Sequence, residues 1–188
     1  MSMVLGNLAG KFLVAMPGMG DPRFEHSLIY VCDYSDEGAM GLIVNKPVED
    51  PDFGQLCDHL LVSRTREINV DVVYGGPVHE KRGFVLHSAD YQPDEAGRVL
   101  GQDLAMSTTL SVIEDLARGA GPVKAMVAMG CAGWSAGQLE KEISQNAWMI
   151  VDADPDLIFS HDFDDKWKTA LVRAGIDARL LEPALGSA

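Results

Sequence analysis

The chain is best understood from one segment, Val127-Ala-Met-Gly-Cys-Ala-Gly-Trp-Ser-Ala-Gly-Gln-Leu-Glu-Lys-Glu-Ile143. Its apolar first part predicts a strand over 123–129, and its periodic last part predicts a helix over 136–146. A glycine-rich turn joins the two. Nucleophile elbows and phosphate-binding loops have this local geometry, so a functional site is expected here first.

Outside this segment the hydrophobic pattern predicts more strands than helices. The other strands are expected at 11–16, 27–33, 39–44, 68–74, 83–88, 98–104, 148–151 and 176–181. A short helix over 53–61 has a capping box formed by Asp52 and Gln55. Ser107 or Thr108 is expected to cap a second helix that ends at Gly119, and Asp162 to cap a last helix.

Strands therefore outnumber helices about two to one, and early hairpins precede the later strand–helix alternation. This order favours an α+β fold with a mixed sheet over a regular doubly wound fold. We find no repeat and no linker, so residues 1–188 are expected to form a single domain, with 182–188 as a flexible tail.

Composition excludes several classes of protein. The 28 acidic residues outnumber the 15 basic ones and give a formal charge of −13. DNA-binding domains gain most of their affinity from clustered basic residues, so the composition disfavours direct DNA binding. The same charge repels anionic membrane surfaces.

Other sequence features favour a cytoplasmic protein. No apolar run has the roughly 18 residues that a membrane-spanning helix needs. The first twenty residues lack the pattern of a secretory signal, and the three cysteines form neither a disulfide framework nor a zinc motif. The segment 152–156 resembles the start of a calcium loop, but Leu157 and Phe163 occupy its glycine and closing-acid positions. We expect neither a metal nor a cofactor.

Ser135 lies in a match to the hydrolase pattern G-x-S-x-G, formed by Gly133 to Gly137. Aspartates at 152–156 and then His161 follow in the order of a Ser–Asp–His triad. Only 53 residues follow Ser135, however, which is too few to supply the usual acid and base strands. A serine hydrolase that uses Ser135 is the alternative hypothesis.

A structural role explains the same residues more completely. Ser135 as the N-cap of the helix and Gln138 three residues later form a capping box. Trp134 and Leu139 are then spaced to form a hydrophobic staple. The glycines match neither phosphate-binding fingerprint, although a helix N-terminus after a glycine turn can bind an anion.

Five segments of the chain resemble the YqgE/AlgH family of bacterial proteins. They are Phe12–Pro17, Gly38–Pro47, Gly75–Val78, Arg82–His87 and Gly130–Glu140. The resemblance continues through Glu142 and Trp148 to 170–171 and 175–177, so it covers nearly the whole chain.

The resemblance implies one α+β domain whose mixed, bifurcated sheet forms a pseudo-barrel with flanking helices. It implies no activity, because the family is largely uncharacterised. Some members are labelled as transcriptional regulators, and this role without strong direct DNA binding is a second alternative. Family members often have tyrosine at the position of Cys131, which disfavours thiol chemistry there.

These observations favour a small-ligand-binding or protein-binding regulatory module without catalysis. Its site is expected where three glycine-rich turns meet. Seven residues are candidates for binding an unknown small molecule or protein: Asn45, Gly75, Gly76, Arg82, Trp134, Gln138 and Glu142. Arg82 offers a fork for a carboxylate or phosphate, and Gln138 and Glu142 share a helix face.

Overall fold

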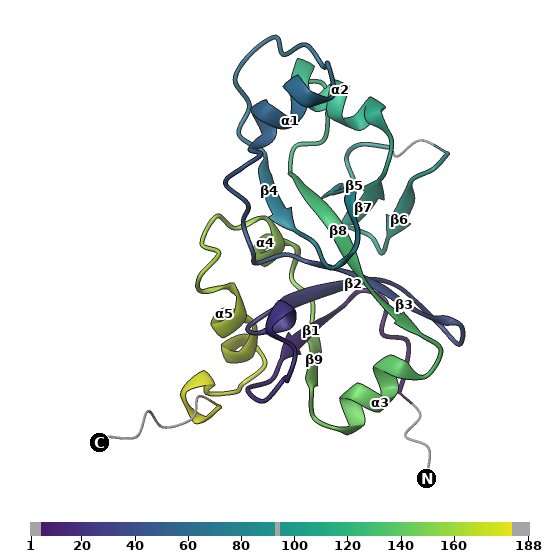
Figure 1. Ribbon diagram of the computed structural model, residues 1–188, viewed down its shortest axis with the longest axis vertical. Helices are drawn as coiled ribbons and strands as arrows, with labels where there is room; N and C mark the ends of the chain where they lie inside the picture. Colours follow the sequence, from purple (N-terminus) through teal and green to yellow (C-terminus); the bar gives the residue numbers. More distant parts are fainter. Residues whose placement is uncertain (1–4, 93–94, 182–188) are drawn as a thin grey trace.

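The computed structural model of the protein describes residues 5–92 and 95–181, and within them one curled sheet dominates (Figure 1). Its strands follow the order β6-β7-β5-β8-β3-β2-β1-β9, with β4 also paired to β8. The strands are β1 (Lys11–Ala15), β2 (Leu28–Ser35), β3 (Gly38–Ile43), β4 (Asp71–Tyr74), β5 (Val78–Ser88), β6 (Arg98–Leu100), β7 (Leu104–Ser107), β8 (Ala125–Ser135) and β9 (Trp148–Asp152). The α-helices are α1 (Phe53–His59), α2 (Leu110–Arg118), α3 (Gln138–Ser144), α4 (Pro155–Phe159) and α5 (Lys166–Arg173).

The long strand β8 joins the two halves of the sheet. Its first part, from Met126 to Met129, lies between β4 and β5, whereas its last part, from Ala132 to Ser135, pairs with β3. The change of partner falls at Gly130, which has a φ of 76°. The β4–β8 pair is parallel and the other pairs are antiparallel. The predicted α+β fold with a mixed, bifurcated sheet is confirmed, and the sheet curls into a half-barrel rather than closing.

The predicted junction between strand and helix differs from the observed one. The residues expected to form a glycine-rich turn continue β8 to Ser135, because Gly130 bends the strand without ending its pairing. The helix α3 then begins at Gln138, and its N-cap is Gly137 at a φ of 74°. Ser135 is therefore not the N-cap, and this prediction was wrong.

Three other elements also differ from the predictions. The strand expected at 176–181 is a short 3-10 helix, η2 (Ala178–Leu180), because the side chain of Asp177 caps a turn by accepting from the Arg179 amide. The strand expected at 98–104 is the hairpin of β6 and β7. The sequence reading missed α4, in which Asp154 caps the helix ahead of Pro155.

The helix starts are also shifted in two cases. The N-cap position of the last helix is Asp165 rather than Asp162, and that of α2 is Thr109 rather than Ser107 or Thr108. The predicted capping box of α1 is confirmed, since Asp52 and Gln55 exchange both hydrogen bonds. The predicted flexible tail at 182–188 lies outside the described residues.

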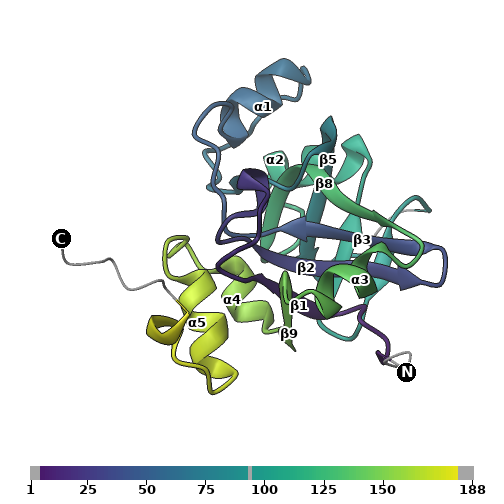
Figure 2. The same cartoon turned by 60° about the horizontal axis from the view of Figure 1, so that its bottom comes forward.

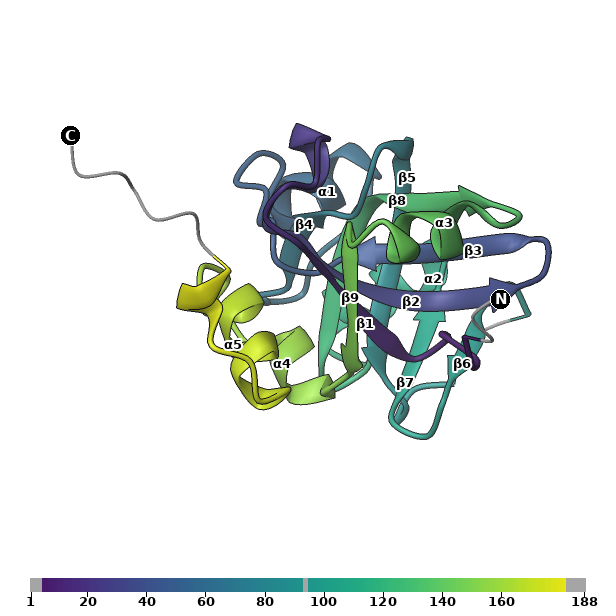
Figure 3. The ribbon, with the colours of Figure 1, turned by 90° about the horizontal axis from the view of Figure 1, so that it is seen from below.

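Helices cover both faces of the part of the sheet that contains β1. Alternate residues of β1 enter different cores, so Phe12 and Val14 pack with α4 and α5 while Leu13 and Ala15 pack with α3. Burial on both faces explains why β1 is apolar from Phe12 to Ala15. Figures 2 and 3 show α3 and the α4–α5 pair on different sides of these strands, and Figure 1 shows α1 and α2 together at the opposite end of the molecule.

None of the helices in the described ranges combines the length and apolar character needed to span a bilayer.

Candidate functional site

Two of the glycine-rich segments, 75–76 and 130–131, lie against each other, and their backbones are in contact. A Cβ atom at Gly75 would collide with the carbonyl oxygen of Gly130, and one at Gly76 would collide with the backbone of Cys131. Gly76 also has a φ of 150°, which other residues rarely adopt. These glycines let two segments pack closely, and a ligand has no room between them.

Asn45 and Arg82 have other surroundings. The side chain of Asn45 accepts from the Leu28 amide at 2.8 Å and donates to the His26 carbonyl at 2.7 Å, so it fixes the start of β2. The Arg82 guanidinium lies 5.3 Å from the centre of the Phe84 ring on β5.

Next to the glycine contact is a hollow of about 530 Å³ between α3 and the segment that joins β1 to β2, which we call the α3 hollow. Its lining residues are Gly18, Met19, Gly20, Asp21, Arg23, Phe24, Pro77, Val78, Gly133, Trp134, Gln138, Glu142, Gln145 and Ala147. Three of the predicted candidates, Trp134, Gln138 and Glu142, therefore lie together. Asn45, Gly75, Gly76 and Arg82 do not line the hollow.

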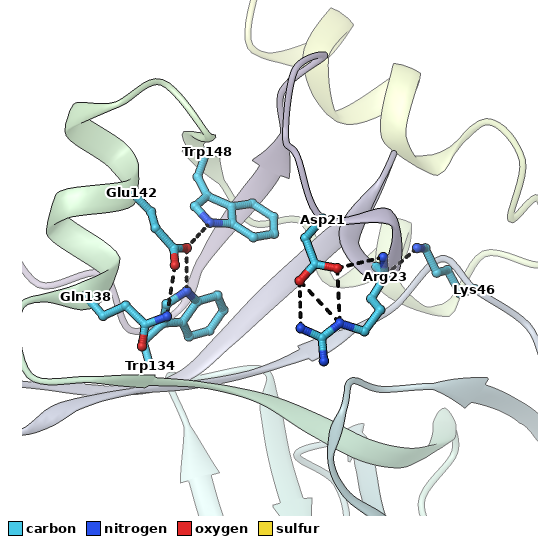
Figure 4. A network of polar contacts seen from close by, with 7 residues as sticks. All are labelled: Asp21, Arg23, Lys46, Trp134, Gln138, Glu142 and Trp148. Carbon is cyan, nitrogen blue, oxygen red and sulfur yellow. Dashed lines mark hydrogen bonds and ion pairs between the residues drawn. The ribbon is translucent and has the colours of Figure 1, made fainter.

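The carboxylate of Glu142 is held by three donors (Figure 4). The indole N–H groups of Trp134 and Trp148 donate to its Oε2 at 2.9 and 2.8 Å. Gln138, one turn earlier on α3, donates to its Oε1 at 2.9 Å. Hydrogen bonds to a charged acceptor are the strong class, so this carboxylate has a fixed position.

The two indole rings that hold Glu142 are themselves fixed by packing. Trp134 is the second-to-last residue of β8 and Trp148 begins β9, and both are buried in the core beneath α3 with Leu139 and Ile143. Their ring centroids lie 6.0 Å apart at an interplanar angle of 82°. The carboxylate thus lies against a rigid aromatic base.

An ion pair forms another part of the lining. The Arg23 guanidinium donates to the Asp21 carboxylate through Nε at 3.0 Å and through Nη2 at 2.7 Å. This hydrogen bonding lowers the pKa of Asp21 below its usual value of 3.8. Lys46 donates to the Arg23 carbonyl at 2.8 Å and so braces the same segment. Figure 4 shows Asp21 and Arg23 beyond the two indole rings, seen from Glu142.

The sequence reading missed Asp21 and Arg23, although a local signal was present. Asp21 followed by Pro22 is the pattern of an N-cap and a first helical residue, and Asp21 does cap a short 3-10 helix, η1 (Pro22–Phe24). The Asp21 carboxylate that accepts from the Arg23 amide in this cap also accepts from the Arg23 guanidinium. Trp148 was expected at the start of a strand and is part of the resemblance, but it was not among the predicted site residues.

The hydrogen bonds of Ser135 and His161 differ from those of a catalytic triad. The Ser135 hydroxyl donates to Oε1 of Gln138 at 3.2 Å, and the Ser135 amide donates to the same oxygen at 3.1 Å. The imidazole Nδ1 of His161 lies 2.7 Å from the Asp71 carboxylate. The geometry therefore disfavours the hydrolase alternative at Ser135.

Cys131 does not have the surroundings of a reactive thiol. Its side chain is buried, and this burial raises the pKa of the thiol above its usual 9.0. Among the described residues, no group of three or more His, Cys, Asp or Glu side chains is placed to hold a metal ion.

Comparison with known proteins agrees with this architecture. The family model described as AlgH-like matches residues 12–179. The chain belongs to the AlgH-like family. This result confirms the resemblance to the YqgE/AlgH proteins.

Relatives in the AlgH-like family match over nearly their full length. A UPF0301 protein of Paracoccus denitrificans is 46% identical over 185 residues, which cover 97% of each chain. One of Ruegeria pomeroyi is 47% identical over 184 residues, which cover 97% of this chain and all of the relative.

Two solved structures are also similar. The solution structure of AlgH from Pseudomonas aeruginosa has a TM-score of 0.77 at 35% identity and covers 99% of this chain and 100% of its own. A crystal structure of a Corynebacterium diphtheriae protein has a TM-score of 0.71 at 19% identity, covering 96% of this chain and 90% of its own, and it supports the fold alone.

Proposed function

We propose that this protein is a regulatory binding module that holds a small organic cation in the α3 hollow. The observation that carries the proposal is the carboxylate of Glu142, fixed by two indole N–H groups at the wall of an open hollow. The volume of about 530 Å³ lies in the usual range for small-molecule sites, roughly 300–1,000 Å³.

The charges of the lining favour a cation. The lining contains two carboxylates, those of Asp21 and Glu142, and one guanidinium, that of Arg23. This guanidinium already donates to Asp21. A carboxylate offers about four acceptor sites, and Glu142 uses three of them. The indole of Trp134 also lines the hollow, and indole attracts cations more strongly than other side-chain rings.

Binding rather than catalysis fits the chemistry of the hollow. No serine, cysteine, histidine or lysine from the described ranges lines it, and its two carboxylates, Asp21 and Glu142, already accept hydrogen bonds from Arg23 and from two indoles. The charge of −13 disfavours direct DNA contact. A role in transcription would therefore act through the bound ligand or through a partner protein.

Isothermal titration calorimetry with putrescine and succinate tests the proposal, because these probes match in length and differ in charge. The protein should bind putrescine and not succinate. Glu142→Gln should weaken the binding at least tenfold. Glu140→Gln is the matched control, since Glu140 lies on the same helix outside the lining and accepts from Tyr34 at 2.7 Å.

Two results would contradict the proposal. One is binding of succinate in preference to putrescine, and the other is an equal loss of putrescine binding in the Glu140 and Glu142 variants. The second result would mean that total charge, rather than the α3 hollow, attracts the amine.

A further inference from the structure

The strand β9 ends the sheet, and the bond pattern shows which of its backbone groups are free. The amide of Met16 donates to the carbonyl of Ala147 at 2.9 Å, and the same register continues along β1 and β9. In an antiparallel pair the groups of every second residue face the partner strand. The groups of Met149 and Val151 therefore face β1, and those of Trp148, Ile150 and Asp152 face away.

Among the described residues, no strand pairs with the outward edge of β9. No residue in 5–92 or 95–181 exchanges a backbone hydrogen bond with the N–H or C=O groups of Trp148, Ile150 and Asp152. Figure 3 shows β9 next to β1, its one neighbour in the strand order. β9 contains neither proline nor lysine, two residues that commonly protect such edges.

A second hollow of about 450 Å³ lies directly beside this edge. Its lining residues are Phe12, Ile150, Val151, Asp152, Ala153, Asp154, Leu157, Ala170, Arg173 and Ala174. Most of these side chains are apolar, and the hollow extends from β9 to α5. Peptides that add a strand to a sheet gain affinity from main-chain bonds and specificity from such adjacent hollows.

The charge around the edge decides which occupant fits. Six aspartates lie between Asp152 and Asp165, and this range contains no lysine or arginine. Lys11, Lys124 and Arg173 pair with three of the six, which leaves an excess of negative charge. A second copy of the chain, with its own charge of −13, would be repelled.

We infer that β9 is a docking edge for an extended, positively charged peptide segment of a partner protein. The peptide adds as a further strand and places an apolar side chain in the hollow between β9 and α5. This interaction is separate from the ligand proposed for the α3 hollow, and each can fail without the other.

The test uses an acetylated heptapeptide of alternating lysine and valine, with an alternating glutamate–valine peptide as the control. Amide hydrogen exchange on the full chain is the readout. The lysine peptide should slow exchange at Ile150 at least tenfold, and the glutamate peptide should leave it unchanged.

A pair of variants tests the backbone bond itself. Ile150→Pro removes the outward N–H and leaves the bonds of Met149 and Val151 to β1, whereas Ile150→Val keeps the N–H. The lysine peptide should bind the valine variant like the wild type and bind the proline variant at least tenfold more weakly.

Three results would overturn the inference. They are equal binding to both variants, equal protection by the two peptides, and no protection by the lysine peptide. Protection at Ile150 that grows with protein concentration alone would also overturn it, because the occupant would then be a second copy. If the Ile150→Pro variant does not fold, amide hydrogen exchange at Ile150 of the wild type still tests the inference.

Discussion

The substitution Glu142→Ala tests the physical role of the carboxylate on which the proposed site depends. It removes the acceptor of two indole N–H groups, those of Trp134 and Trp148, whose side chains are only 7% and 3% exposed. A buried donor without an acceptor costs about 1–3 kcal/mol, so the two together cost about 2–6 kcal/mol. Water can enter from the hollow, which favours the lower end of that range.

Glu142→Gln is the control for this substitution. Both indoles donate to one oxygen, and a glutamine carbonyl can take its place. Only the hydrogen bond from Gln138 is lost, at a cost of about 1 kcal/mol that the alanine variant bears as well, so the two variants differ by the cost of the unpaired indoles alone. Urea unfolding should therefore show the alanine variant about 2 kcal/mol less stable than the glutamine variant. If their unfolding free energies agree within about 0.5 kcal/mol, the carboxylate does not hold the indoles.

Three further predictions concern folding and reactivity. Burial lowers the pKa of Lys166 from 10.5 to about 8, so as the pH rises the native chain loses this proton before the unfolded chain does. The unfolding free energy should therefore rise by up to about 3 kcal/mol from pH 8 to pH 10.5. Urea titrations should show no such rise in Lys166→Met, and an equal rise would refute the assignment. In thermal unfolding, Gly76→Ala should lower the unfolding free energy by about 1–3 kcal/mol more than Gly18→Ala. Both glycines have positive φ, but only a Cβ atom at Gly76 would collide with other atoms. Equal losses of stability would refute the close contact at Gly76. A serine-directed fluorophosphonate probe should label wild type and Ser135→Ala equally, whereas labelling of the wild type alone would revive the hydrolase alternative.

The predicted fold was correct where local chemistry and long-range pairing agree. The capping box of Asp52 and Gln55 lies within one turn of chain, so the sequence contains all its parts. The strand expected at 176–181 failed for the opposite reason. Ile176, Ala178 and Leu181 do pack on the core, although Leu180 is exposed. Asp177 closes a 3-10 turn there, and a run of apolar residues does not distinguish such a turn from a strand.

The path of the chain through Gly130 could not be predicted from the periodicity of the sequence. Glycines at a strand end are typical of a turn, and here Gly130 instead bends one strand that changes partners from β5 and β4 to β3. Those partners lie far away in the sequence. Only the pairing in three dimensions shows that β8 continues to Ser135.

The candidate site was partly predictable for a similar reason. Gln138 and Glu142 are four residues apart on a helix, so their shared face follows from sequence. Asp21 and Arg23 reach the α3 hollow because β1 and β2 pair, which brings the segment between them against α3. No spacing within residues 17–26 indicates that contact.

The central claim is that the α3 hollow binds a cationic amine at Glu142, and the indole N–H signals report on it directly. The chain has three tryptophans, and the indole of Trp167 donates elsewhere, to the Ala15 carbonyl. In a putrescine titration followed by ¹⁵N NMR, the Trp134 and Trp148 indole signals should shift together, while the Trp167 signal stays fixed. A titration in which putrescine binds and neither the Trp134 nor the Trp148 signal moves would contradict the claim.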